Sequence, residues 1–256
     1  MLVMVVVTLT KTRLFRLIAL LDADILAYRI AFACKDEKVN VARLKLSSYI
    51  IDILALKVDR TYEGCFVDDW KLYITGEGNF REQIAVTAPY KGNRTAPKPA
   101  HHQAMREWLL KEWNAINVSG IEADDAIATE ATKLGEGNCV MVSVDKDFDQ
   151  IPGWHYNFVK DVGYYVTKEE GLLSFYKQIL SGDDADNIKG LRNIGSVRAA
   201  DMLSETNNDE LAMWQVCLDA YEGNVDRVLE NARLLWLRKF DNELWIPPTL
   251  RINNGN

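Results

Sequence analysis

The sequence has no apolar run long enough to cross a membrane. Its longest uninterrupted apolar stretch, Leu2 to Val7, is far shorter than the roughly 20 residues that a spanning helix needs. No Lys or Arg precedes this stretch, although a secretory signal peptide would carry one there. These absences predict a cytoplasmic protein with no membrane partner.

Cysteine and histidine are scarce and scattered. The four cysteines occur singly, and the three histidines lie outside the acidic clusters described below. Neither a disulfide framework nor a structural zinc site can be drawn from them. There is no GxSxG motif, which argues against a hydrolytic triad, and the segment from Gly190 to Ser196 lacks the lysine of an ATP-binding loop.

The composition is that of a folded protein with a large core. The chain has 256 residues, of which 48% are hydrophobic and 26% are charged, so disorder is excluded. The formal net charge is −7, which by itself argues against a polyanionic partner. Its distribution changes that reading, because the acidic residues are concentrated in a few short clusters.

Strands and helices alternate along the first two thirds of the chain. The hydrophobic pattern predicts strands at 16–21, 71–75 and 139–144, the second ending in a Gly76-Glu77-Gly78 turn, and a hairpin over 156–166 turning at Gly163. It predicts helices at 25–33, 44–58, 101–113 and 122–134, and then at 168–180, 196–204, 208–221 and 225–236. This order predicts an α/β core over 1–166 with a mostly parallel central sheet flanked by helices, followed by a helical extension over 167–256.

Four clusters hold nine carboxylates that we expect to converge. In a parallel sheet ligands bind at the carboxyl ends of the strands, where two of the clusters fall. Crowded carboxylates repel one another, and only Lys146 and the segment around Lys91 offer countercharge nearby. Oxygen ligands without His or Cys favour Mg²⁺ or Mn²⁺. The clusters contain Asp22, Asp24, Glu122, Asp124, Asp125, Asp145, Asp147, Asp183 and Asp186.

Each cluster taken alone has a simpler explanation. Glu122, Asp124 and Asp125 open a predicted helix, where acidic residues cap and oppose the helix dipole. Asp145 and Asp147 could end a strand and cap a short helix, and the segment 183–186 could be a solvated turn. The coincidence of all four at positions that a parallel sheet brings together favours a metal site.

Five segments, in this order, resemble the metal-dependent 5′-nuclease (flap endonuclease) superfamily, and most closely its small bacteriophage 5′→3′ exonucleases. They are LLDADILAYR, PYKGNR, IEADD, VSVDKDFDQI and GDDADNIKGLRNIGSVRA, and the resemblance extends from about residue 16 to about residue 247. It implies a PIN-like core with a short helical arch around 83–118, and a helix-turn-helix module that binds DNA in the C-terminal extension.

The resemblance also implies a metal-binding set for two Mg²⁺ or Mn²⁺ ions. Asp125 and Asp183 would support the ligands from outside, and Asp24 is a less secure match. Where relatives carry an aspartate after the second strand, this chain has Thr75, Gly76 and then Glu77, so either Glu77 substitutes or that ligand is missing. The implied ligands are Asp22, Glu122, Asp124, Asp145, Asp147 and Asp186.

Further residues gain roles through the same resemblance. Lys91 and Arg94 would contact the scissile phosphate, Lys98 would contact DNA at the arch, and Tyr28 would stack on an unpaired terminal base. A solvated basic loop and an ordinary helix tyrosine remain the alternatives. The helix-turn-helix within 182–199, with a K⁺ ion, would grip duplex DNA through Lys189, Gly190, Arg192, Gly195, Ser196 and Arg198.

The function that the resemblance implies is hydrolysis of phosphodiesters from the 5′ ends of duplex DNA by a two-metal-ion mechanism. Flaps and RNA primers in RNA/DNA hybrids are further substrates that it implies, in phage replication or DNA degradation. Two alternatives stay open: a catalytically inactive, structure-specific DNA-binding protein of the same fold, and a PIN-type ribonuclease.

Overall fold

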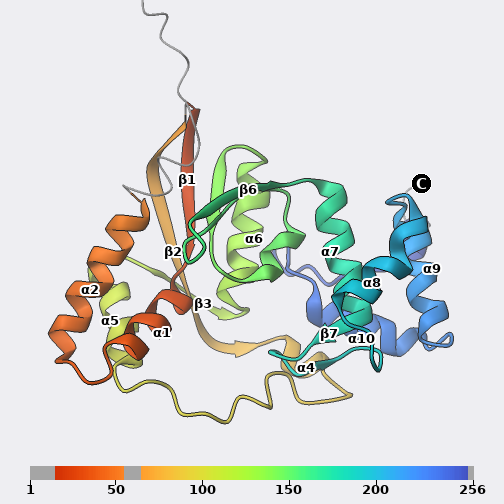
Figure 1. Ribbon diagram of the computed structural model, residues 1–256, viewed down its shortest axis with the longest axis horizontal. Coiled ribbons are helices and arrows are strands. Elements are labelled where there is room, and N and C mark those ends of the chain that lie inside the picture. Colours follow the sequence, from red (N-terminus) through yellow and green to blue (C-terminus); the bar gives the residue numbers. More distant parts are fainter. Residues whose placement is uncertain (1–14, 55–64, 253–256) are drawn as a thin grey trace, which may run out of the picture.

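The protein is built on one six-stranded sheet, which a computed structural model describes together with the rest of residues 15–54 and 65–252. The strands lie in the order β3-β2-β1-β4-β5-β6, and all neighbours are parallel except β5 and β6 (Figure 1). The mostly parallel sheet predicted from the sequence is therefore confirmed. The strands are β1 (Phe15–Asp22), β2 (Cys65–Asn79), β3 (Ile116–Gly120), β4 (Cys139–Val142), β5 (Gly153–Asn157) and β6 (Val162–Val166).

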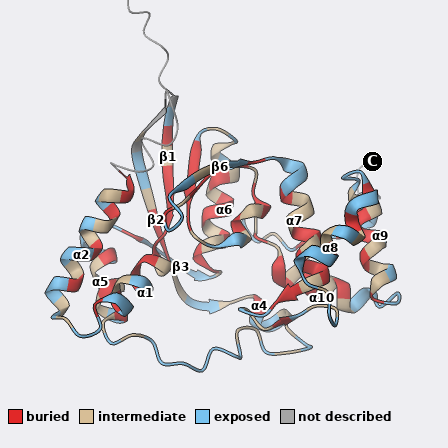
Figure 2. Cartoon of the chain, in the orientation of Figure 1, coloured by how far each residue is buried: buried red, intermediate tan, exposed pale blue. Residues whose placement is uncertain are grey.

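Helices cover both faces of the sheet because side chains alternate along each strand. Ala19 and Leu21 of β1 pack in one core with α1 (Ala23–Ala33), α2 (Val39–Ile51) and α5 (His102–Glu112). Leu20 points to the opposite face and packs in a second core with α6 (Ala123–Leu134). Figure 2 shows the buried residues running along the sheet and the inner sides of these helices.

A third core lies in the C-terminal helices. Phe175, Trp214 and Trp245 are buried there with residues of all four helices α7–α10. These helices lie beside the sheet rather than over one of its faces (Figure 1). These four helices are α7 (Lys168–Ser181), α8 (Ser196–Leu203), α9 (Glu210–Ala220) and α10 (Val225–Leu235).

Short elements connect the main helices and strands along the whole chain. They are α4 (Arg81–Ile84), η2 (Lys146–Gln150), β7 (Gly182–Asp183), β8 (Ile188–Lys189), η3 (Ser204–Thr206) and α11 (Pro248–Ile252).

The second strand is longer than predicted, and its neighbour β3 was not predicted. Gly76 and Gly78 do not form a turn, because β2 continues through them to Asn79 and pairs with β3. A Cβ atom at Gly76 would lie 2.4 Å from the carbonyl oxygen of Val118, so a larger residue would separate the two strands. The glycines therefore serve close strand pairing, and β3 is too short to be recognised from its own sequence.

The hairpin is present, but it turns earlier than predicted. Gly163 lies in β6 opposite Tyr156, and the chain reverses between Asn157 and Val162. The Asn157 side chain accepts the backbone N–H groups of Val159 and Lys160, which builds the turn locally. The helix predicted at 44–58 corresponds to α2, which begins earlier, at Val39. Residues 55–58 of that prediction lie outside the described residues.

The segment between α4 and α5 crosses the molecule below the carboxyl ends of the strands (Figure 1). Its first part is attached to α10, because the Glu230 carboxylate accepts the N–H groups of Val86 and Thr87, each at 2.7 Å.

The described residues contain no helix that is both long and apolar enough to cross a membrane.

Candidate active site

A cavity of about 810 Å³ opens at the carboxyl ends of the central strands. Strands β1 and β4 are adjacent and parallel, with Leu21 opposite Val142, so the residues that follow both strands meet at one edge. Acidic residues from three distant parts of the sequence line this cavity, whereas Asp147, Asp183 and Asp186, which the sequence predicted to converge with them, are not in its wall. The acidic residues in its wall are Asp22, Asp24, Glu122, Asp124 and Asp145.

Asp22 is the most enclosed of these carboxylates. It ends β1, caps α1 by accepting the N–H of Ile25, and accepts the hydroxyl of Ser143 at 3.2 Å. Burial, together with the negative charges of Asp24 and Asp145, raises the pKa of Asp22 to about 7. A positive charge near Asp22 is therefore needed before this carboxyl group ionises readily at neutral pH.

The acids that open α6 divide into different tasks. Glu122 is the N-cap, and its reciprocal capping partner is Asp125. Burial and the charges of Asp125 and Glu122 raise the pKa of Asp124 well above its ordinary value. The capping explanation thus holds for Glu122 and Asp125, and the Asp124 carboxylate also accepts an N–H of the first turn, that of Asp125 at 2.6 Å.

Asp145 and Asp147 stand on the short helix η2. The Asp145 carboxylate caps it by accepting the N–H of Asp147 at 3.0 Å, and Gln178 of α7 donates to Asp147. Burial of the carboxyl group, followed by the charges of Asp145 and Asp183, raises the pKa of Asp147 to about 7. Burial also raises the pKa of Asp145.

Glu122 and Asp186 are held by groups from the loop between α4 and α5, residues 85–101, called the crossing loop below. The hydroxyl oxygen of Tyr90 lies 2.6 Å from a Glu122 oxygen and 2.7 Å from an Asp186 oxygen, so the two carboxylates share its one proton. The Lys91 ammonium pairs with Glu122 and lies 3.6 Å from Asp186, and Arg94 lies 2.6 Å from Asp186. Although burial alone would raise it, the charges of Lys91 and Arg81 lower the pKa of Glu122.

The carboxylates therefore fall into two groups. Glu122, Asp186 and Asp183 have cationic partners, the last through Lys146 at 3.1 Å. Over the described residues, no three His, Cys, Asp or Glu side chains stand together as a ready ligand set. The acids without an ion pair to any described residue are Asp22, Asp124, Asp145 and Asp147.

The residues fit hard divalent cations. Burial, together with the negative charges of neighbouring carboxylates, raises the pKa of all four unpaired carboxylates, so protein cations do not balance their charge. Every donor in the group is a carboxylate oxygen, and such donor sets bind Mg²⁺ or Mn²⁺ rather than softer metals. A cation among these side chains would remove the repulsion that the pKa shifts report.

Asp125 occupies a different environment from the other predicted ligands. It is fully buried, and both its oxygens accept from Arg81, at 2.6 and 2.8 Å. Arg81 also donates to the carbonyl oxygens of Leu234 and Trp236, so it joins α6 to the end of α10. Sequence reasoning missed Arg81, because nothing local marks an arginine whose partner lies 44 positions away.

Asp24 is likewise committed within the protein. Its carboxylate accepts the N–H of Thr75 at 2.7 Å and pairs with Arg106, which also donates to the Thr75 carbonyl. The Thr75 hydroxyl accepts the N–H of Ala123. Thr75 thus stands at the site, whereas Glu77 is exposed and does not line the cavity.

The remaining predicted residues, which are Tyr28 of α1 and three basic residues of the crossing loop, border the same cavity. Tyr28, Lys91, Arg94 and Lys98 all line it, and Tyr28 is 46% exposed. Lys91 has a φ of 54°, a left-handed backbone conformation that is uncommon for a residue with a side chain. Its backbone N–H donates to the Asp186 carbonyl at 2.9 Å, which holds it in place.

The predicted helix-turn-helix departs from the expectation in its connection. Between α7 and α8 the chain forms the two-stranded ladder of β7 and β8, which differs from a simple turn. A Cβ atom at Gly190 would lie 2.1 Å from the backbone carbon of Ser181, so Gly190 serves internal packing rather than close approach to a phosphate. The other residues of this segment that were predicted to contact DNA are all exposed, and they are Lys189, Arg192, Gly195, Ser196 and Arg198.

Comparison with protein families gives a match over residues 17–178 to the family described as 5′-3′ exonuclease, N-terminal resolvase-like domain. The chain belongs to this 5′-3′ exonuclease family. The match includes the first three acidic clusters and the segment that contains Lys91 and Arg94.

Curated relatives of this exonuclease-family chain are similar over part of its length. DNA polymerase I of Borreliella burgdorferi is 31% identical over 152 residues, 54% of this chain and 16% of that protein. Flap endonuclease Xni of Shewanella frigidimarina is 39% identical over 97 residues, 33% of this chain and 37% of that protein. The 5′-3′ exonuclease of Buchnera aphidicola is 28% identical over 155 residues, 52% of this chain and 48% of that protein. The matched segment spans less than half of each relative.

Solved structures share the fold over most of the chain. The bacteriophage T5 flap endonuclease, in a pseudo-enzyme–product complex with DNA and metal ions, has a TM-score of 0.57 at 17% identity, covering 85% of this chain and 88% of that one. T5 5′-exonuclease with bound zinc has a TM-score of 0.58 at 17% identity, covering 86% and 89%. At this identity the likeness establishes the fold.

Proposed function

We propose that this chain is a Mg²⁺-dependent 5′→3′ exonuclease that hydrolyses phosphodiesters from the 5′ end of duplex DNA. The observation that carries the proposal is the group of unpaired carboxylates Asp22, Asp124 and Asp145, which line one cavity with Lys91 and Arg94 at the carboxyl ends of β1 and β4. An anionic pocket bordered by cations suits two positive ions and a phosphate between them.

Asp22, Asp124, Asp145 and Asp147 would hold the two ions. Glu122 and Asp186 would join them once Lys91 and Arg94 turn toward the substrate. When bound, Mg²⁺ supplies Lewis-acid stabilisation of the phosphate oxygens and lowers the pKa of water. Asp125 and Asp183 would act from outside, since Arg81 and Lys146 neutralise them.

The crossing loop would provide the contacts to the reacting phosphate. Lys91 and Arg94 are charged donors, and such donors stabilise the extra negative charge of the pentacoordinate phosphate. Tyr28 offers an exposed ring at the same cavity, where stacking of a terminal base would contribute about 1–3 kcal/mol. Lys98 would contact the strand as it enters.

The exposed start of α8 would grip the duplex away from the cut. Gly195 is the N-cap of α8 and no side chain caps this helix, so its first N–H groups are available to a phosphate. A K⁺ ion would bind in the same region. Lys189, Arg192 and Arg198 add positive charge without reading sequence. We place this activity in the bacterial cytoplasm, in phage DNA replication or degradation, with flaps and RNA/DNA hybrids as further substrates.

A cleavage assay with 5′-labelled substrates tests the proposal. We expect labelled mononucleotide or short products from duplex DNA in Mg²⁺, none in EDTA, and less product from a duplex without a free 5′ end. Binding of duplex DNA without turnover in either Mg²⁺ or Mn²⁺ would instead identify an inactive DNA-binding protein. A preference for RNA without a DNA strand would identify a PIN-type ribonuclease.

Replacing Lys91 with methionine is expected to strengthen divalent metal binding while it weakens cleavage. The Lys91 ammonium pairs with Glu122 and lies near Asp186, so a metal must compete with it for these oxygens. We expect Mn²⁺ affinity, measured by electron paramagnetic resonance titration, to rise by about fivefold or more. Lys98→Met, in the same loop but without such a pair, is the control. Equal Mn²⁺ affinity in the parent and Lys91→Met would contradict the competition.

The metal-free protein is expected to lose stability as pH rises from about 4 to about 7. Asp22 and Asp147 have a pKa of about 7 in the fold against the ordinary 3.8. Below about pH 4 both carboxyl groups are protonated in the folded and in the unfolded state, and their contribution to stability is fully present. As the pH rises, the unfolded chain loses these protons first, and the free energy of unfolding falls by about 1.4 kcal/mol per pH unit for each group. Urea denaturation in EDTA measures this. A free energy of unfolding that rises across the interval would overturn the assignment.

A further inference from the structure

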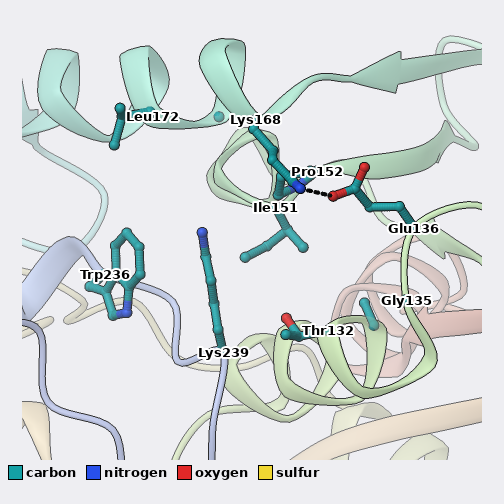
Figure 3. A pocket seen from close by; sticks show the side chains of 11 residues that line it. Thr132, Gly135, Glu136, Ile151, Pro152, Lys168, Leu172, Trp236 and Lys239 are labelled. Carbon is teal, nitrogen blue, oxygen red and sulfur yellow. Dashed lines mark ion pairs between the residues drawn. The ribbon is translucent and has the colours of Figure 1, made fainter. Parts of the chain in front are cut away.

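A second cavity, of about 390 Å³, lies at the other end of α6 from the candidate active site. Asp124 stands at the start of this helix and Gly135 follows its end, so the two cavities are separated by roughly 17 Å along the helix axis. Its walls come from the end of α6, the residues after η2, the start of α7 and the segment after α10 (Figure 3). The proposed nuclease mechanism uses none of these residues.

The cavity contains a lysine without a carboxylate partner. The Lys239 ammonium makes no ion pair within the described part of the chain, although the negative charges of Glu243 and Glu210 act on it from a greater distance. Glu243 accepts the backbone N–H of Lys239. Its charged group lies 4.4 Å from the centre of the Trp236 ring. Burial lowers the pKa of Lys239, which reports the cost of holding a poorly compensated charge there.

A second hydrogen-bond donor at the cavity is also unmatched. The indole Nε1 of Trp236 is buried and has no acceptor among the described residues. Figure 3 shows Lys239 beside the Trp236 ring, with the indole nitrogen at the opposite end of the ring from the Lys239 ammonium. By contrast, Lys168 at the rim pairs with Glu136 at 3.2 Å.

The Lys239 ammonium donates and cannot accept, so a ligand that pairs with it must bring acceptors. The other walls are apolar, formed by Ile151, Pro152 and Leu172. A ligand that satisfies both conditions has one acidic group and an apolar or aromatic body. The volume is at the lower end of the roughly 300–1,000 Å³ that small-molecule sites occupy.

We propose that this cavity binds a small organic anion, with its acidic group on Lys239 and its apolar body against Trp236, Ile151 and Leu172. A nucleoside 5′-monophosphate and a non-nucleotide aromatic acid share this chemistry. This site is independent of the proposed function, because no residue of the candidate active site contributes to it.

Nitrogen-15 NMR of the full-length chain in EDTA tests the site through the indole N–H signal of Trp236. The chain has seven tryptophans, so comparison with Trp236→Phe assigns the signal. The probes are deoxyadenosine 5′-monophosphate and 1-naphthoate, with deoxyadenosine and 1-naphthalenemethanol as their uncharged counterparts. We expect at least one anion to shift the Trp236 signal saturably, and neither uncharged compound to do so.

Variants of the lysine establish where the anion binds. Lys239→Met is expected to weaken binding by about tenfold or more, Lys239→Arg to retain it, and Lys168→Met to change it by less than about threefold. A response to the nucleotide identifies that source, and a response to naphthoate alone identifies a different aromatic acid. No shift of the Trp236 signal with either anion, or equal affinity in the parent and Lys239→Met, would overturn the proposal.

Discussion

Asp22→Asn is expected to abolish DNA cleavage and, at the same time, to stabilise the metal-free protein. Asparagine keeps one oxygen to cap α1, and its amide NH2 takes the place of the oxygen that accepts from Ser143, where it can donate to that hydroxyl. The change removes a charge that burial and neighbouring carboxylates oppose. At pH 8 we expect the free energy of unfolding in EDTA to rise by about 1–3 kcal/mol. Cleavage should fall more than about 100-fold, since even outer partners of metal ligands contribute about 10- to 100-fold.

The combination of lost activity and increased stability separates a functional carboxylate from a structural one. The stability gain should vanish near pH 4, where Asp22 is protonated in the parent protein as well. Asp241→Asn, at an exposed pair with Lys133, is the matched control and should change neither quantity. A variant that is less stable than the parent at pH 8, or one that still cleaves, would exclude Asp22 from the metal-binding group.

Arg81→Met is expected to destabilise the protein by about 3–5 kcal/mol, because it leaves the buried Asp125 charge without a partner. The carbonyl oxygens of Leu234 and Trp236 lose a donor as well. Urea denaturation at pH 7 measures the loss. Lys133→Met, which breaks the exposed pair with Asp241, should cost under about 1 kcal/mol.

The double variant Arg81→Met/Asp125→Asn distinguishes an unpaired charge from lost packing. Removing the buried negative charge should recover part of the stability, so the two changes together should cost less than the sum of the single changes. Additive losses would mean that the pair does not act as a unit. Because Arg81 joins α6 to the end of α10, the single variant should also displace Glu122 and reduce cleavage.

The sheet edge where the site forms could be predicted because each step depends on local pattern. An apolar run that ends in Asp22 and another that ends before Asp145 are buried parallel strands, and parallel strands direct their carboxyl ends to one edge. The short β3 escaped prediction because it depends on pairing with β2 across Gly76. Such pairing has no signature within five residues of sequence.

The role of each acid could not be predicted in the same way. Glu122, Asp124 and Asp125 are consecutive or nearly so, and any of them could cap a helix or bind a metal. Packing decides between them, since Arg81 reaches Asp125 and leaves Asp124 unpaired. Of the cations that matter, the sequence pointed to Lys146 and the segment around Lys91, but it did not point to Arg81 or Arg106.

The sequence by itself determined the fold class, the family, and the clustering of acids at one edge, because hydrophobic period and motif order are properties of neighbouring residues. Only the tertiary structure decided which acids are neutralised and which stay unbalanced, and that Lys239 lines a cavity without an ion pair to any described residue. Charge compensation depends on distances of a few ångströms between residues far apart in sequence, and those distances exist only in the packed molecule.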